Sequence, residues 1–170
     1  MNNPFERIEP KQLNFNTFGI LDDEWMLVTG GIKSNCNTMT ASWGGFGILW
    51  NKPVAFVFIR PQRYTYQFAE KYDHLTLSFF TEQYRDALNY CGSHSGKDVD
   101  KIKECGLTLF ETEAGSIGFN EARMVLECKK LYFQDIDPVN FLDQKIDKMY
   151  PKKDYHRMFI CEITNCFHKK

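Results

Sequence analysis

The sequence lacks the features that mark membrane, secreted and nucleic-acid-binding proteins. No apolar run is long enough to span a membrane, and residues 1–15 contain no long apolar segment of the kind a secretory signal requires. Lys and Arg together number 21 against 22 Asp and Glu, which leaves a net charge of −1 and no basic excess for nucleic acid or anionic lipid. We therefore expect a cytoplasmic protein with neither nucleic-acid nor membrane partners.

The six cysteines form no CxxC pair and no zinc-like group with the four histidines. We expect reduced structural thiols and no metal site. Cys161 and Cys166 are an odd number of positions apart in an apparent strand, so their side chains should face opposite ways. A disulfide between them would need a break in that strand.

Motifs of several enzyme classes are also absent. The sequence has no GxGxxG for a Rossmann domain, no GxSxG elbow, and no carboxylate pair that stands out from the surface charge. Residues 92–97, Gly-Ser-His-Ser-Gly-Lys, approach a Walker A loop, but one residue is missing between the glycines and Asp98 replaces the required Ser or Thr. We therefore reject NTPase activity, and hydrolytic chemistry finds little support.

What the sequence does contain is a succession of β patterns. At 170 residues and 20.0 kDa it fits one domain, spanning 1–170. Apolar or alternating segments predict strands, and residues 54–59 read as a strand buried on both faces. We predict a mainly β protein, an antiparallel split β-barrel with a few peripheral α-helices; the expected strands lie at 25–28, 38–43, 54–59, 74–80, 107–110, 117–119, 122–132 and 156–167.

Three helices are expected between these strands, at 66–72, 82–90 and 96–105. Thr81 is placed to cap the second, which Gly92 would end, and Gly106 would end the third. Residues 137–153 are charged and bounded by prolines, so they should form a surface excursion with a possible helix at 138–148.

The most informative segment joins the strand at 54–59 to the first helix. Arg60 and Arg63 follow the strand, and Tyr64 and Thr65 add hydroxyl groups before the helix begins. Guanidinium groups donate paired hydrogen bonds to phosphate oxygens, and a helix start offers unpaired backbone N–H groups. The segment is typical of a phosphate site, although an ordinary solvated turn explains it equally well.

Two further segments could contact a flat polar ligand. In residues 38–43, the hydroxyls of Thr38, Thr40 and Ser42 fall on one strand face, and Met39 and Trp43 fall on the other. A solvent-facing strand would show the same pattern. The second segment is a loop before a helix, and its candidate contacts to a phosphate or a ribityl hydroxyl are Ser95, Gly96, Lys97 and Lys101.

In this order the segments resemble the FMN-binding split-barrel proteins of the flavin reductase-like family, in particular its flavoredoxin-type branch. The similarity extends from about Trp25 to Phe167. It is carried by TMTASW at 38–43, RPQRYTY at 60–66, SGKDVDK at 95–101 followed by Gly106-Leu107, Leu126-Glu127-Cys128, and DYHRMFICEI at 154–163. Two positions depart from the family pattern, because Lys97 replaces a usual Arg and Cys161 a usual Gly.

The resemblance implies a homodimer with one FMN per subunit near the dimer interface. It places Thr38, Thr40 and Ser42 along the flavin, and it places the loop of Ser95, Gly96, Lys97 and Lys101 over the cofactor. Arg60, Arg63 and Thr65 would bind the phosphate. His156 falls where the family often has an active-site histidine.

Two redox functions are consistent with this resemblance. In the first, a flavin reductase takes hydride from NADH or NADPH onto N5 of FMN and passes electrons to free flavin or to a protein acceptor, while the protein supplies position and electrostatics. The alternative is a flavoredoxin-type electron-transfer protein without significant NAD(P)H turnover. A third, non-redox possibility is a split barrel that binds another phosphorylated or heme-like ligand.

Overall fold

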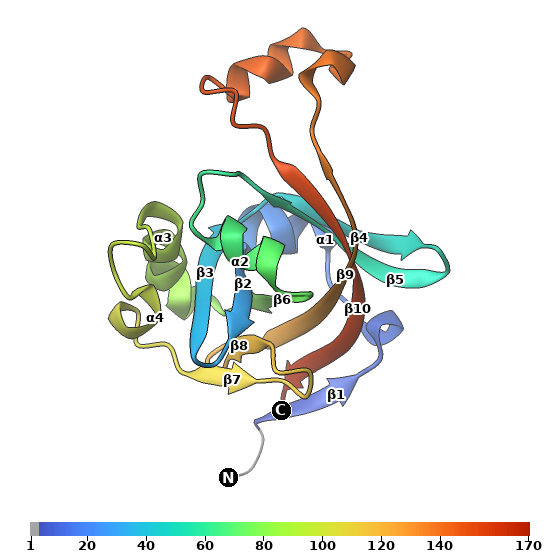
Figure 1. Cartoon of the computed structure of the whole chain (residues 1–170). Coiled ribbons are helices and arrows are strands. Elements are labelled where there is room, and N and C mark those ends of the chain that lie inside the picture. Colours follow the sequence, from blue (N-terminus) through green and yellow to red (C-terminus); the bar gives the residue numbers. More distant parts are fainter. Residues whose placement is uncertain (1–3) are drawn as a thin grey trace.

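The main sheet has eight antiparallel strands and wraps around an apolar core (Figure 1). The computed structural model describes residues 4–170. Along the sheet the order is β3-β2-β6-β9-β10-β5-β4, and β1 pairs with the C-terminal end of β10, residues 166–169. The strands of the main sheet are β1 (Phe5–Ile8), β2 (Met26–Ile32), β3 (Asn35–Ala41), β4 (Gly44–Leu49), β5 (Lys52–Ile59), β6 (His74–Phe79), β9 (Met124–Asp135) and β10 (Arg157–Lys169).

Short helices and a small hairpin surround this barrel. The hairpin consists of β7 (Leu109–Glu111) and β8 (Ile117–Phe119). The helical segments are η1 (Pro10–Gln12), α1 (Thr17–Gly19), η2 (Ile20–Glu24), α2 (Thr65–Lys71), η3 (Glu82–Tyr84), α3 (Arg85–Ser93), α4 (Lys101–Glu104), η4 (Pro138–Asn140) and η5 (Gln144–Met149). The prediction of a mainly β antiparallel barrel with peripheral helices is therefore confirmed. No helix in residues 4–170 is long and apolar enough to cross a membrane.

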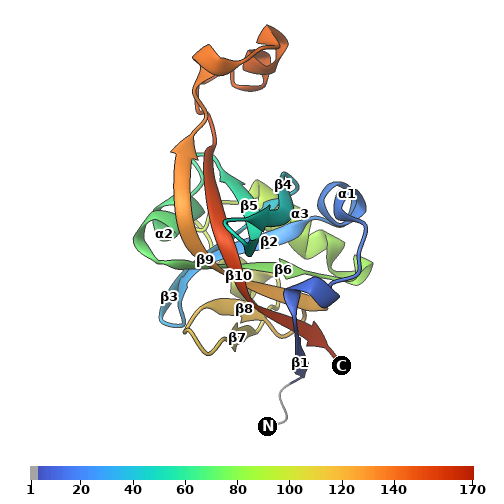
Figure 2. The ribbon, with the colours of Figure 1, turned by 90° about the vertical axis from the view of Figure 1, so that its right-hand side faces the viewer.

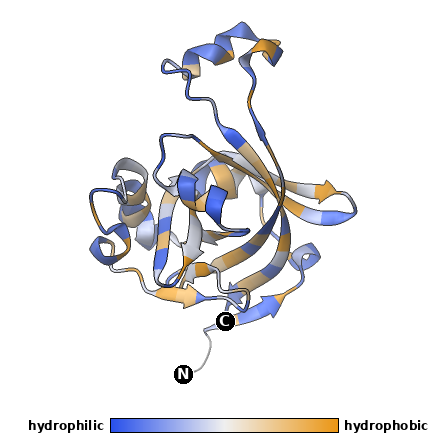
Figure 3. Ribbon diagram, in the orientation of Figure 1, coloured by the Kyte–Doolittle hydropathy of each residue, from blue (hydrophilic) through white to orange (hydrophobic). Residues whose placement is uncertain are grey.

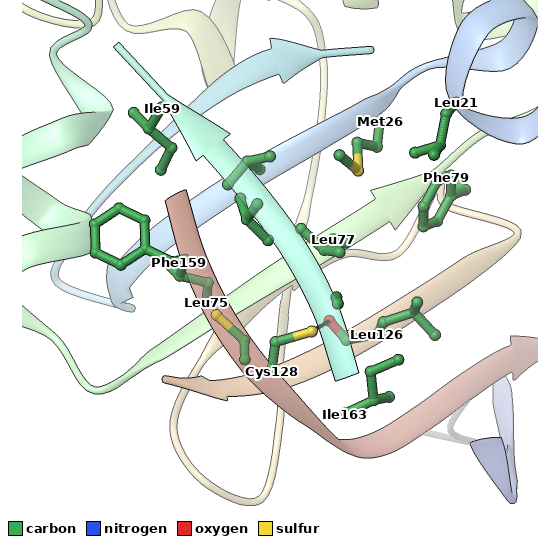
Figure 4. Close-up of a cluster of buried hydrophobic side chains, with 14 of the residues drawn as sticks. Leu21, Met26, Ile59, Leu75, Leu77, Phe79, Leu126, Cys128, Phe159 and Ile163 are labelled. Atoms are coloured by element: carbon green, nitrogen blue, oxygen red, sulfur yellow. Dashed lines mark hydrogen bonds between the residues drawn. The ribbon is translucent and has the colours of Figure 1, made fainter. Parts of the chain in front are cut away.

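Alternating strand residues build the core inside the barrel. Leu75, Leu77 and Phe79 of β6 point into it together with Leu126 of β9 and Phe159 of β10, and none of these side chains is more than 2% exposed (Figure 4). Hydropathy along the ribbon follows the same alternation (Figure 3). Burial of this apolar surface is the main favourable contribution to folding.

The prediction that residues 54–59 are buried on both faces is only partly correct. Ala55, Val57 and Ile59 are completely buried in the core, whereas Phe56 and Phe58 are half-buried. The reason is that alternate residues of β5 face away from the core, and the outer face of an antiparallel sheet is commonly left partly open. Phe58 is thereby left to line a cleft.

A bulge overturns the prediction for Cys161 and Cys166. The register of β10 against β9 shifts between Ile163 and Asn165, so the extra residue Thr164 reverses the alternation. Both cysteines consequently point into the same core and are fully buried, and all six cysteines are free thiols.

The helices differ from the predicted ones in extent. The predicted helix at 82–90 divides into η3 and α3, Thr81 makes no side-chain cap, and α3 continues past Gly92 to Ser93. The predicted helix at 96–105 is reduced to α4, because residues 95–99 form a turn and the Asp100 carboxylate caps the N–H of Lys103. The helix expected at 138–148 is replaced by η4 and η5.

Residues 136–156 form an arm that projects away from the barrel between the ends of β9 and β10 (Figures 1 and 2). This confirms the predicted surface excursion. The base of the arm is held to the barrel through Arg60, which donates to the carbonyl of Met149 at 3.0 Å and pairs with Asp154 at 3.3 Å. The arm therefore contributes its lower residues to the surface next to the end of β5.

Candidate functional site

The end of edge strand β3, the end of β5 and the base of the arm enclose a cleft of about 210 Å³, which we call the ring cleft. Its walls combine apolar and aromatic groups with hydroxyl, guanidinium and imidazole groups. The residues that line it are Met39, Thr40, Ala41, Ser42, Trp43, Phe58, Arg60, Arg63 and His156. Such a mixture suits a flat ligand with polar atoms at its rim.

His156 occupies one side of the ring cleft in a largely apolar setting. Its ring centroid lies 5.0 Å from that of Trp43 and 6.4 Å from that of Phe58. The imidazole Nδ1 is 2.8 Å from the hydroxyl of Tyr150. Burial and the nearby Arg60 charge lower the pKa of His156 to about 4, although Asp154 opposes them. At neutral pH His156 is therefore uncharged and can offer one N–H donor and one acceptor.

The three predicted hydroxyls of β3 do not all reach the ring cleft. Thr40 lines it, although its hydroxyl also donates to the carbonyl of Leu88 at 2.5 Å, and Ser42 lines it at the strand end. Thr38 is completely buried, and its hydroxyl lies 2.9 Å from that of Thr29 on β2. The strand alternation was correct, but the neighbouring strand supplies Thr38 with a partner and keeps it out of the cleft.

Two cations converge at a second cleft of about 120 Å³, which we call the anion cleft. Arg63 donates to the carbonyls of Gly92 at 2.8 Å and Cys91 at 3.3 Å, and the Lys101 ammonium donates to the same Cys91 carbonyl at 3.3 Å. The lining residues are Gln62, Arg63, Tyr64, Thr65, Gly92, Ser93, His94, Ser95 and Lys101. None of these described residues is acidic, so a bound anion would meet positive charge and hydroxyl groups without opposing carboxylates.

Burial leaves both cations of the anion cleft poorly solvated. Burial is the main cause of a lowered pKa at Arg63. Burial also lowers the pKa of Lys101 to about 8, and the nearby Arg63 charge acts in the same direction. Lys101 is only 4% exposed. Two like charges held close together in a poorly solvated site favour the entry of an anion, because the anion offsets their repulsion.

The turn at Ser95, Gly96 and Lys97 separates the anion cleft from a third, polar cleft of about 530 Å³. Ser95 lines the anion cleft, Gly96 and Lys97 line the third cleft, and Lys101 lines both. A side chain at Gly96 would collide with the Asn37 amide, whose nitrogen donates to the Thr65 hydroxyl at 2.7 Å. Asn37 thus joins the loop to the start of α2.

Arg60 and Arg63 occupy different places, although the sequence grouped them. Arg63 lines both the ring cleft and the anion cleft and so joins them. Arg60 lines only the ring cleft, where it pairs with Asp154 and stacks over Tyr150 at 4.9 Å. Of the predicted site residues, only Thr38 lies outside all three clefts.

Sequence reasoning missed Phe58, Asn37 and Tyr150. Phe58 was assigned to a strand buried on both faces, but it lies on the outer face of β5, which is only half-buried. Asn37 precedes the alternating hydroxyl segment, and nothing in the sequence distinguishes its amide from that of Asn35 two positions earlier. Tyr150 lies in the excursion, where no pattern indicates contact with His156.

Comparison with known protein families places most of the chain in one family. Residues 21–170 match the family described as "Flavin reductase like domain". A comparison with curated proteins finds no match.

Solved structures with the same fold include an FMN-binding domain of a flavin reductases-like enzyme from Shewanella baltica, with a TM-score of 0.71 and 20% identity over 99% of this chain and 79% of that one. Flavoredoxin from Desulfovibrio vulgaris has a TM-score of 0.68 and 23% identity, covering 94% and 73% of the two chains. An NADH:FAD oxidoreductase from Streptomyces globisporus has a TM-score of 0.65 and 16% identity, covering 85% and 75%.

Proposed function

The chain belongs to the flavin reductase-like family of FMN-binding split-barrel proteins, and from this premise we propose that it is an FMN-dependent NAD(P)H:flavin oxidoreductase. The observation that carries the proposal is the junction of the ring cleft and the anion cleft at Arg63. Each cleft is smaller than the range of about 300–1,000 Å³ typical of small-molecule sites. A ligand with a flat ring at one end and a phosphate at the other would occupy both.

The phosphate of FMN fits the anion cleft by charge and by donor type. Arg63 has five N–H donors, and the carbonyls of Cys91 and Gly92 take up two of its nitrogens. Its remaining donors, the Lys101 ammonium and the hydroxyls of Thr65 and Ser95 would hold the phosphate.

The ring of FMN fits the ring cleft by shape and polarity. Trp43 and Phe58 offer apolar surface, while Thr40, Ser42 and Arg60 offer polar groups. When bound, FMN supplies the redox chemistry, accepting hydride from a nicotinamide and passing electrons onward. The residues of the cleft hold the ring, restrict access of water to it and, through neutral His156, offer a hydrogen-bond partner that needs no proton release at neutral pH.

Space for a nicotinamide favours the reductase over the electron-transfer alternative. A cleft of about 510 Å³ adjoins the ring cleft and shares Ser42, Trp43 and Phe58 with it. Its other walls come from α1, η2, the start of β4 and the base of the arm, and they are mostly apolar. A planar, weakly polar group in this cleft would lie beside the flavin.

Association of two copies is part of the proposal. The arm and the adjoining strand ends expose Phe133, Val139, Leu142 and Met149, each at least half exposed. Apolar side chains grouped on a projecting segment are typical of an interface. We expect a homodimer, and light scattering coupled to size exclusion should give twice the mass of the chain.

Anaerobic mixing of the FMN-loaded protein with NADH or NADPH tests the reductase function. Loss of the visible flavin absorbance with either donor is the expected result. Turnover should then appear as NAD(P)H oxidation with added free FMN as acceptor. Absence of bleaching with both donors would contradict the reductase and favour the flavoredoxin-type electron-transfer protein, with a protein acceptor in place of free flavin.

A further inference from the structure

Two free thiols face each other beneath the anion cleft. The Sγ atoms of Cys91, in the last turn of α3, and Cys105, immediately after α4, are 3.9 Å apart. The two helices lie side by side at one flank of the barrel (Figure 1). The segment between the cysteines, residues 92–104, includes the Ser95–Lys97 turn and Lys101. Hence the pair stands at the two ends of the loop that lines the anion cleft.

Few hydrogen bonds attach α4 to α3, although Ile102 and Cys105 pack against the buried cluster that contains Leu88 and Cys91. The α4 helix is a single turn, and helices of that length are not stable by themselves. Its polar links to α3 are the Lys101 ammonium on the Cys91 carbonyl at 3.3 Å and the Cys105 thiol near the Ala87 carbonyl at 3.8 Å. A one-turn helix with so few hydrogen bonds to its neighbour can shift locally without global unfolding.

We propose that Cys91 and Cys105 form a dithiol that hydrogen peroxide oxidises to a disulfide, which holds residues 92–104 closed over the anion cleft and slows cofactor release. The Cys105 sulfur attacks a peroxide oxygen, which yields a sulfenic acid and one water. The Cys91 thiol then condenses with that sulfenic acid, which forms the S–S bond and releases a second water. Two thiols thereby lose two electrons and two protons, and the peroxide gains them.

The geometry allows this step with limited movement. A disulfide brings the sulfurs to about 2.05 Å, so the two Sγ atoms must approach by roughly 2 Å. Rotation of the side chains and a small shift of the one-turn helix α4 would suffice, because α4 is attached to α3 by few bonds. Cys105 is half-buried and is therefore the thiol that peroxide can reach, while Cys91 is fully buried.

The electrostatic setting makes the reaction slow, because little of either thiol is ionised at neutral pH. Burial raises the pKa of both thiols, that of Cys91 to about 12, while the Lys101 charge opposes this rise at each of them. Arg63 also favours the Cys91 thiolate, whereas Glu104 disfavours that of Cys105. Cys128, Cys161 and Cys166 are fully buried in the barrel core, where peroxide cannot reach them directly. Cys36 has no thiol partner among the described residues. Cys91 and Cys105 are therefore the pair positioned to form a disulfide.

The consequence for the site follows from the Cys91 carbonyl. This single oxygen accepts from both Arg63 and Lys101, so the last turn of α3 positions both cations of the anion cleft. A disulfide would fix that turn against the end of α4, the helix that begins with Lys101. The part of the inference that concerns cofactor release rests on the proposed FMN function, whereas the disulfide and the closure of the loop do not.

The test treats the purified protein with hydrogen peroxide or with a dithiol reductant and compares the two forms. Peptide mass spectrometry should find Cys91 and Cys105 in one linked peptide pair, lighter by two hydrogens. Amides of residues 94–104 should exchange hydrogen more slowly in the oxidised form. In protein loaded with FMN, the rise of flavin fluorescence on dilution should be slower by about fivefold or more after oxidation. C105S should abolish all three differences, and C36S should retain them.

Three results would overturn the inference: the absence of the linked peptide with oxidation found elsewhere, a linked peptide without slower exchange in residues 94–104, or slower exchange with unchanged FMN release. A protein that shows the linked peptide and the slower exchange but binds no FMN in either form would refute the proposed function and the effect on release. The oxidation site and the closure of the loop would stand in that case.

Discussion

Replacing Arg63 with alanine tests the assignment of the anion cleft most sharply. Arg63 joins the ring cleft to the anion cleft, and among residues 4–170 only the carbonyls of Cys91 and Gly92 accept hydrogen bonds from its guanidinium. A hydrogen bond to a charged group contributes about 1.5–3 kcal/mol. Because about 1.4 kcal/mol corresponds to a tenfold change in Kd, Arg63→Ala should weaken FMN binding about 10- to 150-fold.

The assay is a fluorescence titration of flavin-free protein with FMN, since binding in an aromatic cleft quenches flavin emission. Arg63→Lys keeps the charge but loses the paired N–H geometry, so its Kd should fall between those of the parent and the alanine variant. Arg85→Ala is the matched control. Arg85 begins α3, pairs with Glu82 at 2.9 Å and lines neither cleft, so its loss should leave FMN affinity unchanged.

Thermal unfolding must accompany the titration, because Arg63 also bonds the carbonyls that end α3. The Cys91 carbonyl keeps the Lys101 ammonium as a donor in the variant, so we expect a small decrease in Tm and a folded protein. A folded Arg63→Ala protein that binds FMN within about threefold of the parent, a difference below 1 kcal/mol, would refute the phosphate assignment.

Three further predictions concern pH and packing. The pKa of His156 is about 4 in the folded protein and 6.5 ordinarily, so as pH falls the imidazole is protonated in the unfolded chain before it is protonated in the folded one. The free energy of unfolding should therefore fall by up to about 3 kcal/mol as pH drops from 6.5 to 4. Urea titrations should show a smaller fall for His156→Asn, and equal falls would contradict the assignment. Because the pKa of Lys101 is about 8, its ammonium loses its charge between pH 7 and 9, and FMN affinity should decrease over this range in the parent and less in Lys101→Arg. Identical pH profiles of the two proteins would count against a role for Lys101. Gly96→Ala should weaken FMN binding by about 1–3 kcal/mol, because the added methyl group collides with Asn37. Adding Asn37→Ala to this variant should restore part of the lost affinity. Unchanged FMN affinity in Gly96→Ala would show that binding does not need the close approach of the loop to Asn37.

Local patterns predicted the elements well and their surroundings poorly. Alternation located most of the strands, and the apolar run at 54–59 was correctly assigned to the sheet. The run does not show that the outer face of β5 is only half-buried, and so it does not place Phe58 in the ring cleft. The same limit applies to Thr38. Period two placed it with Thr40, but nothing in that segment indicates that Thr29 lies opposite and takes its hydroxyl.

The bulge at Thr164 depends on the strand register, which the local pattern does not reveal, whereas Asp100 is an N-cap signal that could have indicated a later start for the helix, at Lys101. The candidate site was predicted as pieces and not as an assembly. Arg63 and the Ser95 loop were both linked to phosphate. They lie close together because α2, which follows Arg63, and α3, which precedes the loop, both pack against β3. The neutral state of His156 depends on burial beside Tyr150 and Arg60 at the base of the arm, a contact between segments that no periodicity encodes.

The central claim is that this chain holds a flavin mononucleotide where the ring cleft and the anion cleft join. Its most direct test is the visible absorption spectrum of the purified protein after incubation with FMN and removal of the excess. The account predicts retained flavin absorbance at one FMN per chain, with the bands shifted from those of free FMN. A colourless protein that retains none would contradict it.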